Sequence, residues 1–96
     1  MNEKELYRKK AQAELDQLKA ELDKLKAKAD KADADTKLVA NKQIKELESK
    51  IKEGQTKLNE LAETSADAWG SLKGGVDSAM DSLKAGFKDA ASKFKE

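Results

Sequence analysis

The spacing of the apolar residues restricts the fold of this sequence more than any other feature, because it alternates between three and four over most of the chain. The first run is Ala11, Leu15, Leu18, Leu22, Leu25, Ala29 and Ala32. The second run is Ile44, Leu47, Ile51, Gly54, Leu58 and Leu61. Such spacing forms the a/d seam of a heptad repeat, along which helices pack side by side. We therefore predict an all-α protein.

The two seams differ in phase by one residue. Extending the first seam places an a position at Thr36, whereas the second seam starts eight residues further on, at Ile44; such a skip relaxes a supercoil or marks a bend. Because the joining segment contains neither glycine nor proline, we predict one continuous helix over about residues 3–63. The alternative is a turn near residues 33–36, where Asp and Thr are good N-cap residues, which gives a three-helix bundle. The lack of a residue suited to the left-handed conformation disfavours that turn.

The composition restricts the function. A chain of 96 residues predicts a single helical domain over residues 1–96. It contains no cysteine and no histidine, so it lacks disulfides, Cys/His zinc sites and the usual general base near neutral pH. Its 20 basic and 19 acidic residues give a net charge of +1, which does not attract nucleic acid. We expect a protein that is not an enzyme, with no catalytic, cofactor-binding or metal-binding residues, no small-molecule substrate and no nucleic-acid partner.

A second unit begins near Thr64. The sequence TSAD at residues 64–67 matches a capping box, so we predict a capped turn at residues 64–65 and a helix over about residues 66–95. Three copies of an eleven-residue repeat follow, AWGSLKGGVDS, AMDSLKAGFKD and the partial copy AASKFKE, which aligns Trp69 with Met80 and Ala91. Eleven residues close three helical turns, so the repeat keeps one apolar face. That face consists of Trp69, Leu72, Val76, Met80, Leu83, Phe87 and Phe94.

Three interpretations of this apolar face are open. It packs on the first helix as an antiparallel hairpin, it lies on a lipid surface, or it binds another protein. The five acidic and five basic residues after residue 63 disfavour lipid, because interfacial helices are usually basic. If the face covers residues 38–61, part of the first seam has no partner within the chain, and we expect self-association there, with a dimer favoured. That self-association seam consists of Leu15, Leu18, Leu22, Leu25, Ala29 and Ala32.

Four of the five glycines also lie in this last segment, at positions 70, 74, 75 and 86. Each costs a helix interior about 1 kcal/mol relative to alanine, so the segment is a poor helix until it docks. The spacing of four between Gly70 and Gly74 suits close approach of a neighbouring backbone. The alternative is a solvent-exposed face that tolerates glycine.

The chain consists, in order, of a Lys/Glu-rich heptad helix, the stretch KAKADKADADTK, a second heptad run and the segment around Trp69. This order resembles that of a widespread group of small bacterial coiled-coil proteins, associated with stress response or of unknown function. The most specific matches are Ala68, Trp69, Leu72, Lys73, Gly75 and Val76. The chain departs from that group at Gly70 and Gly74, where stronger helix formers are usual, and at Met80, where a second tryptophan is expected. The resemblance implies a helical fold and a link to stress, with no catalytic residues. The eleven-residue period also resembles desiccation-protection proteins and exchangeable apolipoproteins.

The first ten residues, MNEKELYRKK, lack the apolar core of a secretory signal, and no apolar run is long enough to span a bilayer, so we expect a soluble, cytoplasmic protein. The expected function is that of a structural coiled-coil or helical-bundle protein that self-associates and is related to stress. The alternative is a conditional lipid-surface-binding or protective helix that uses the repeat of residues 68–94.

Overall fold

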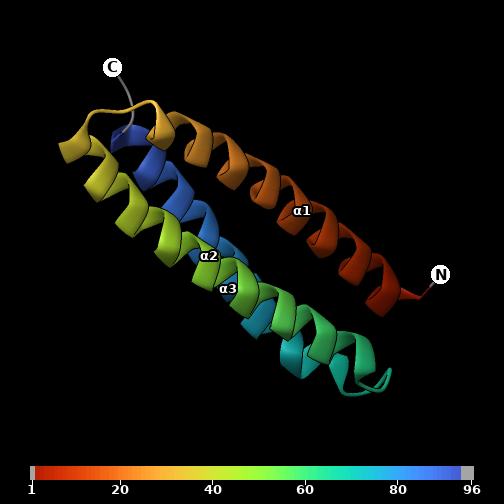
Figure 1. Ribbon diagram of the computed structural model, residues 1–96. Helices are drawn as coiled ribbons and strands as arrows, with labels where there is room; N and C mark the ends of the chain where they lie inside the picture. Colours follow the sequence, from red (N-terminus) through yellow and green to blue (C-terminus); the bar gives the residue numbers. More distant parts are fainter. Residues whose placement is uncertain (1, 94–96) are drawn as a thin grey trace.

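The fold is a bundle of three helices. A computed structural model describes residues 2–93, which form α1 (Glu3–Asp30), α2 (Ala34–Glu63) and α3 (Trp69–Lys93) (Figure 1). The chain runs up, down and up, so the start of α1 lies beside the turn between α2 and α3. The Cα atoms span 51 × 19 × 17 Å. The all-α prediction is confirmed, and the three-helix alternative describes the arrangement.

The predicted continuous helix over residues 3–63 is not formed, because the chain turns at residues 31–33. The amides of Lys31 and Ala32 donate to the carbonyls three residues earlier, at 3.2 and 3.1 Å, which tightens the last turn of α1. Asp33 is then extended and caps α2, since its carboxylate accepts a hydrogen bond from the Thr36 amide at 2.8 Å. No residue among 2–93 has a positive φ. The argument against a turn is therefore wrong, because α1 ends without a left-handed residue.

The second turn also differs from the prediction. The Thr64 hydroxyl donates to the Glu60 carbonyl at 2.7 Å, so Thr64 closes α2 and does not cap the next helix. The Ser65 carbonyl accepts hydrogen bonds from the amides of Ala68 and Trp69, at 3.1 and 3.2 Å. Residues 66–68 form a turn, and α3 begins at Trp69 and not near residue 66. The capping-box pattern missed this because Thr64 also lies four residues after Glu60, where its hydroxyl reaches a free carbonyl at the end of α2.

One apolar cluster holds the three helices together. Within residues 2–92, no polar or charged residue is buried. The largest fully buried side chains come from every helix: Leu15 of α1, Leu58 and Leu61 of α2, and Val76 and Leu83 of α3. Burying a leucine side chain contributes about 1.5–3 kcal/mol relative to leaving it exposed. The heptad seams are therefore the source of the fold, as their spacing predicts.

The first two copies of the eleven-residue repeat describe the packed face of α3, and the third copy does not. The buried residues of α3 are Val76, Met80, Leu83, Phe87 and Ala90. Ala91, which the repeat aligns with Met80, is exposed, whereas Ala90 has an exposed fraction of only 1%. After Met80 the spacing is therefore that of a heptad. The seams of α1 and α2 are heptads too, and α3 has to follow the same period to remain in contact with them.

Candidate functional site

The predicted self-association seam lies inside the bundle. Leu15, Leu18, Leu22, Leu25 and Ala29 belong to the core cluster, and Ala32 is half-buried in the turn after α1. The exposed fraction of Leu15 is 0% and that of Leu18 is 8%. The premise that this seam lacks a partner within the chain is wrong, because the turn at residues 31–33 folds α2 and α3 onto it.

The predicted apolar face of α3 also points into the core. Val76, Met80, Leu83 and Phe87 are buried. Trp69 and Leu72 are half-buried and pack against the same cluster. Phe94 lies outside the described residues. This arrangement is the hairpin-packing interpretation with a third helix added, and the face that was considered for lipid is covered by α1 and α2.

An aromatic cluster joins the starts of α1 and α3. The Tyr7 and Trp69 rings lie 5.8 Å apart between centroids and are tilted by 40°. The Tyr7 hydroxyl donates a hydrogen bond to the Asp77 carboxylate, and the Lys73 carbonyl, a second acceptor, lies 3.3 Å from the same hydroxyl oxygen. The Lys73 ammonium lies 5.3 Å from the centre of the Tyr7 ring, within range of a cation–π contact. Sequence reasoning missed this cluster, because the alternation of three and four places the next seam position before Ala11 at Arg8, and Tyr7 lies beside the seam.

The environment of Tyr7 favours its neutral form. Partial burial raises the pKa of the Tyr7 hydroxyl above its usual value of 10.0, and the hydrogen bond to the Asp77 carboxylate raises it further. A deprotonated Tyr7 could no longer donate this hydrogen bond, and its negative charge would face the negative charge of Asp77. The cluster is therefore a neutral phenol that ties α1 to α3 across the physiological pH range.

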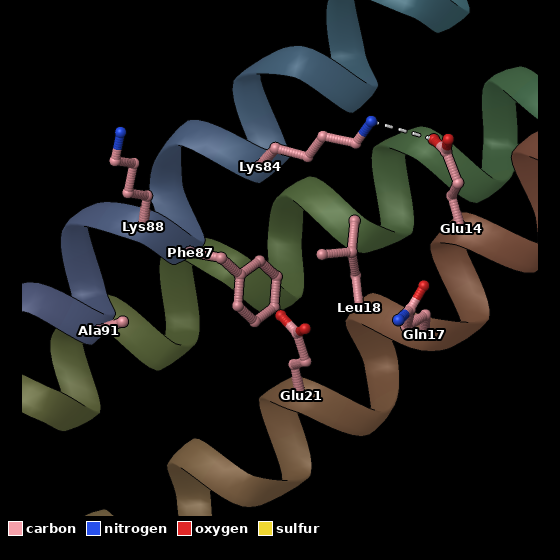
Figure 2. Close-up of a pocket in the computed structure, with 8 residues that line it drawn as sticks. All are labelled: Glu14, Gln17, Leu18, Glu21, Lys84, Phe87, Lys88 and Ala91. Carbon is pink, nitrogen blue, oxygen red and sulfur yellow. Dashed lines mark ion pairs between the residues drawn. The ribbon is translucent and has the colours of Figure 1, made fainter.

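A groove runs between α1 and α3, the two helices that contact each other least (Figure 2). Its floor is formed by Leu18 and Phe87, which point toward one another in Figure 2. Along its edge the Lys84 ammonium pairs with the Glu14 carboxylate at 3.2 Å, and both side chains are about half exposed. An exposed pair of this kind contributes ~0–1 kcal/mol. The groove is an open surface depression between two helices, and the charges of Lys84 and Glu14 at its edge neutralise each other.

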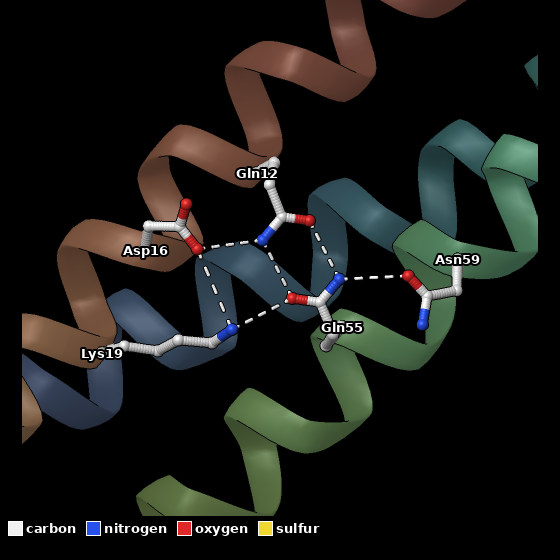
Figure 3. A network of polar contacts seen from close by, with 5 residues as sticks. All are labelled: Gln12, Asp16, Lys19, Gln55 and Asn59. Atoms are coloured by element: carbon white, nitrogen blue, oxygen red, sulfur yellow. Dashed lines mark hydrogen bonds and ion pairs between the residues drawn. The ribbon is translucent and has the colours of Figure 1, made fainter.

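A polar network joins α1 to α2 on another side of the bundle (Figure 3). The amide groups of Gln12 and Gln55 exchange two hydrogen bonds, each 2.9 Å long. Gln12 also donates to the Asp16 carboxylate at 3.0 Å, and Gln55 donates to the side-chain oxygen of Asn59 at 3.1 Å. The Lys19 ammonium donates to Gln55 Oε1 at 3.1 Å. Two complementary amides that face each other fix the axial register of α1 against α2. The heptad pattern gave no signal for this pair, because both residues flank the seams.

Two further contacts connect the helices at their ends. The Lys26 ammonium of α1 pairs with the Glu48 carboxylate of α2 at 2.9 Å, and this hydrogen bond raises the pKa of Lys26. The Lys4 ammonium donates to the Thr64 carbonyl at 2.6 Å and so caps the end of α2. The described polar side chains that bridge two helices thus act as ties along the bundle.

The glycines of α3 fall into two groups. A Cβ atom added at Gly70 or Gly74 would meet nothing within 4 Å, so these two lie on the open face, as the alternative interpretation predicted. A Cβ atom at Gly86 would lie 3.0 Å from Leu47 Cδ2. A Cβ atom at Gly75 would lie 4.0 Å from Lys57 Nζ, the end of a flexible side chain, so among the glycines of α3 only Gly86 marks a close approach to α2.

Among residues 2–93, no group of three or more acidic, His or Cys side chains is placed to hold a metal ion. None of the helices in the described part of the chain has an apolar stretch long enough to cross a membrane.

Comparisons of the chain with protein-family models, with curated proteins and with solved structures found no match. The class is therefore defined by the structure alone: an up-down-up three-helix bundle with an apolar core and polar ties between its helices.

Proposed function

We propose that this chain is a structural helical-bundle protein that is not an enzyme and that self-associates. The observation that carries the proposal is the distribution of its side chains. The apolar residues form one cluster shared by three heptad seams, and the polar side chains that bridge elements do so to hold helices together. The three seams are already paired within one chain, so self-association requires a helix of one copy to pack on the seams of another.

The test of self-association is the mass of the full chain as a function of concentration. Sedimentation equilibrium from low to high micromolar concentration is expected to show a shift from monomer to dimer. The melting temperature is expected to rise over the same concentration range, because an association that only folded chains can form stabilises the folded state. A strict monomer with a melting temperature independent of concentration would overturn the proposal.

A second candidate function is conditional binding of a lipid surface by α3. The observation in its favour is that Gly70 and Gly74 weaken α3 without making a packing contact. A helix that is weak by composition and apolar on one face can leave the bundle and dock elsewhere. The balanced charge of the segment works against it, as does the burial of its apolar face.

Trp69 reports on this second function, because it is the only tryptophan and lies at the start of α3. If α3 binds lipid, anionic vesicles shift the Trp69 emission to the blue and raise the helix content of the full chain. Neutral vesicles are the matched control. An emission maximum that ignores both kinds of vesicle would dispose of the lipid hypothesis.

A role under stress and a cytoplasmic location complete the proposal, and both derive from the sequence. The stress link is supported by the resemblance around Trp69. Its test is the abundance of the protein in its source cells before and after heat and osmotic stress. An unchanged abundance under both conditions would remove the stress role and leave the structural proposal intact.

A further inference from the structure

The turn between α1 and α2 has the geometry of a hinge. Only Lys31, Ala32 and Asp33 separate the two helices. Lys31 lies in the right-handed helical region, with φ −94° and ψ −5°. Asp33 has a helical φ of −69° and departs from helical geometry only in ψ, which is 170° instead of about −42°. At Lys31 and Asp33, both the turn and a continuous helix therefore lie in allowed backbone regions.

The residues of this hinge support both conformations. Lysine and alanine are strong helix formers, which favours a continuous helix through the hinge. The closed turn is held by the hydrogen bond from the Thr36 amide to the Asp33 carboxylate. An opened hinge replaces this bond with backbone bonds of the i to i−4 type. The local sequence is thus compatible with the continuous helix that the sequence predicts and with the turn that the structure shows.

A second copy can restore each contact that α1 leaves when the hinge opens. The seam of α1 packs on α2 and α3, and polar ties such as Lys26 with Glu48 and Glu14 with Lys84 join the same helices. When α1 of one copy packs on α2 and α3 of another, these contacts form again between the chains. Exchange of an identical element between copies is a low-cost route to a dimer for this reason.

We propose that the chain forms a domain-swapped dimer, in which the hinge at residues 31–33 opens and α1 of each copy packs on α2 and α3 of the other. This inference rests on the proposed function, since it specifies how the chain self-associates. The same seam residues are buried in the monomer and in the dimer. The dimer is an elongated pair of bundles joined through two straightened hinges.

A proline at Ala34 tests the hinge directly. Ala34 is exposed and is the first residue of α2, where proline is well tolerated. Asp33 already has the extended ψ that a following proline requires. In the opened form the same proline would lie inside a continuous helix and clash with the Asp30 carbonyl. Ala34→Pro is therefore expected to keep a folded monomer and lose the dimer, whereas the matched control Ala34→Ser keeps both.

The opposite variant favours the opened hinge. Asp33→Ala removes the cap of α2 and places a strong helix former in the hinge. It is expected to raise the dimer fraction in size-exclusion chromatography after concentration. A dimer fraction that is equal in Asp33→Ala, Ala34→Pro and the unchanged chain would overturn the swap.

Crosslinking identifies which chain supplies α1. Gln12 and Gln55 face each other, and the chain has no cysteine of its own. A Gln12→Cys chain and a Gln55→Cys chain are unfolded, mixed, refolded at high concentration and treated with a short bismaleimide. A crosslinked heterodimer that disappears when both chains carry Ala34→Pro supports the swap. A dimer by mass without this crosslink overturns the swap and leaves self-association standing, whereas a monomer at every concentration overturns both.

Discussion

Gly74 offers a quantitative test of the packing of α3. Alanine at this position is expected to stabilise the protein by about 0.5–1 kcal/mol, because glycine in a helix interior costs that much. The added Cβ atom meets nothing within 4 Å, and no glycine among residues 2–93 has a positive φ, so no contact or strain opposes the gain. For a domain of this size, 1 kcal/mol corresponds to a melting-temperature change of about 4–8 °C.

Gly86 is the matched control in the same helix. Gly86→Ala gains the same helix propensity, but its Cβ atom would lie 3.0 Å from Leu47 Cδ2 and displace that side chain. Thermal and urea denaturation followed by circular dichroism are expected to rank Gly74→Ala above the unchanged chain and Gly86→Ala below Gly74→Ala. If the two variants had equal stability, or if Gly74→Ala were the less stable, the assigned faces of α3 would be wrong.

Three other predictions follow from the core, the aromatic cluster and the cap of α2. Leu83→Ala is expected to destabilise the protein by about 2–5 kcal/mol in urea denaturation, because Leu83 is fully buried, whereas Leu6→Ala at a 54% exposed position is expected to be nearly neutral. Folding raises the pKa of Tyr7, so the contribution of Tyr7 to the free energy of unfolding is complete below pH 10.0 and is lost as the pH rises further. In an ultraviolet titration, tyrosinate is therefore expected to form at higher pH in the folded chain than in urea. Asp77→Asn is expected to reduce that difference. The hydrogen bond from the Thr36 amide lowers the pKa of Asp33, so the contribution of Asp33 to the free energy of unfolding is present above pH 3.8 and is lost on acidification. Asp33→Ala is expected to reduce the loss of stability at acidic pH. An unchanged loss of stability in this variant would show that Asp33 does not cap α2.

The sequence predicts the apolar face of each helix well, because heptad spacing alone determines which side chains share a face. The two seams of residues 11–61 agree with the buried residues of α1 and α2, apart from half-buried Ala32 and from Ala40, which is buried but belongs to neither predicted seam. Even Gly54, at a seam position, is buried, and a Cβ atom there would lie 3.6 Å from Leu15 Cδ1. The period is a local property, so it can be read without knowledge of the fold.

The turns could not be predicted with the same success, because the same residues can form hydrogen bonds that continue a helix or hydrogen bonds that end it. Lys31 and Ala32 are good helix formers, and their tightened hydrogen bonds at the end of α1 leave no sequence signature. Thr64 suits a helix start and a helix end equally well, and the free carbonyl of Glu60 decides between them.

The contacts between helices depend on the turns and were missed for the same reason. Tyr7 reaches Asp77 and Gln12 reaches Gln55 only after the chain has folded back twice. In each pair the residues are distant in sequence and neither is apolar enough to mark a seam. The self-association seam was placed on an open surface for this reason, although its residues were identified correctly as a packing face.

The closed turn at residues 31–33 is the feature on which the fold and the proposed swap both depend. Small-angle X-ray scattering of the dilute monomer tests it most directly. The three-helix bundle predicts a maximum dimension near the 51 Å length of its Cα trace, extended only by side chains and hydration, and a radius of gyration near 15.4 Å. A continuous helix over residues 3–63 would instead give a rod of about 90 Å at 1.5 Å per residue. A maximum dimension near that of the rod in the monomer would contradict the account.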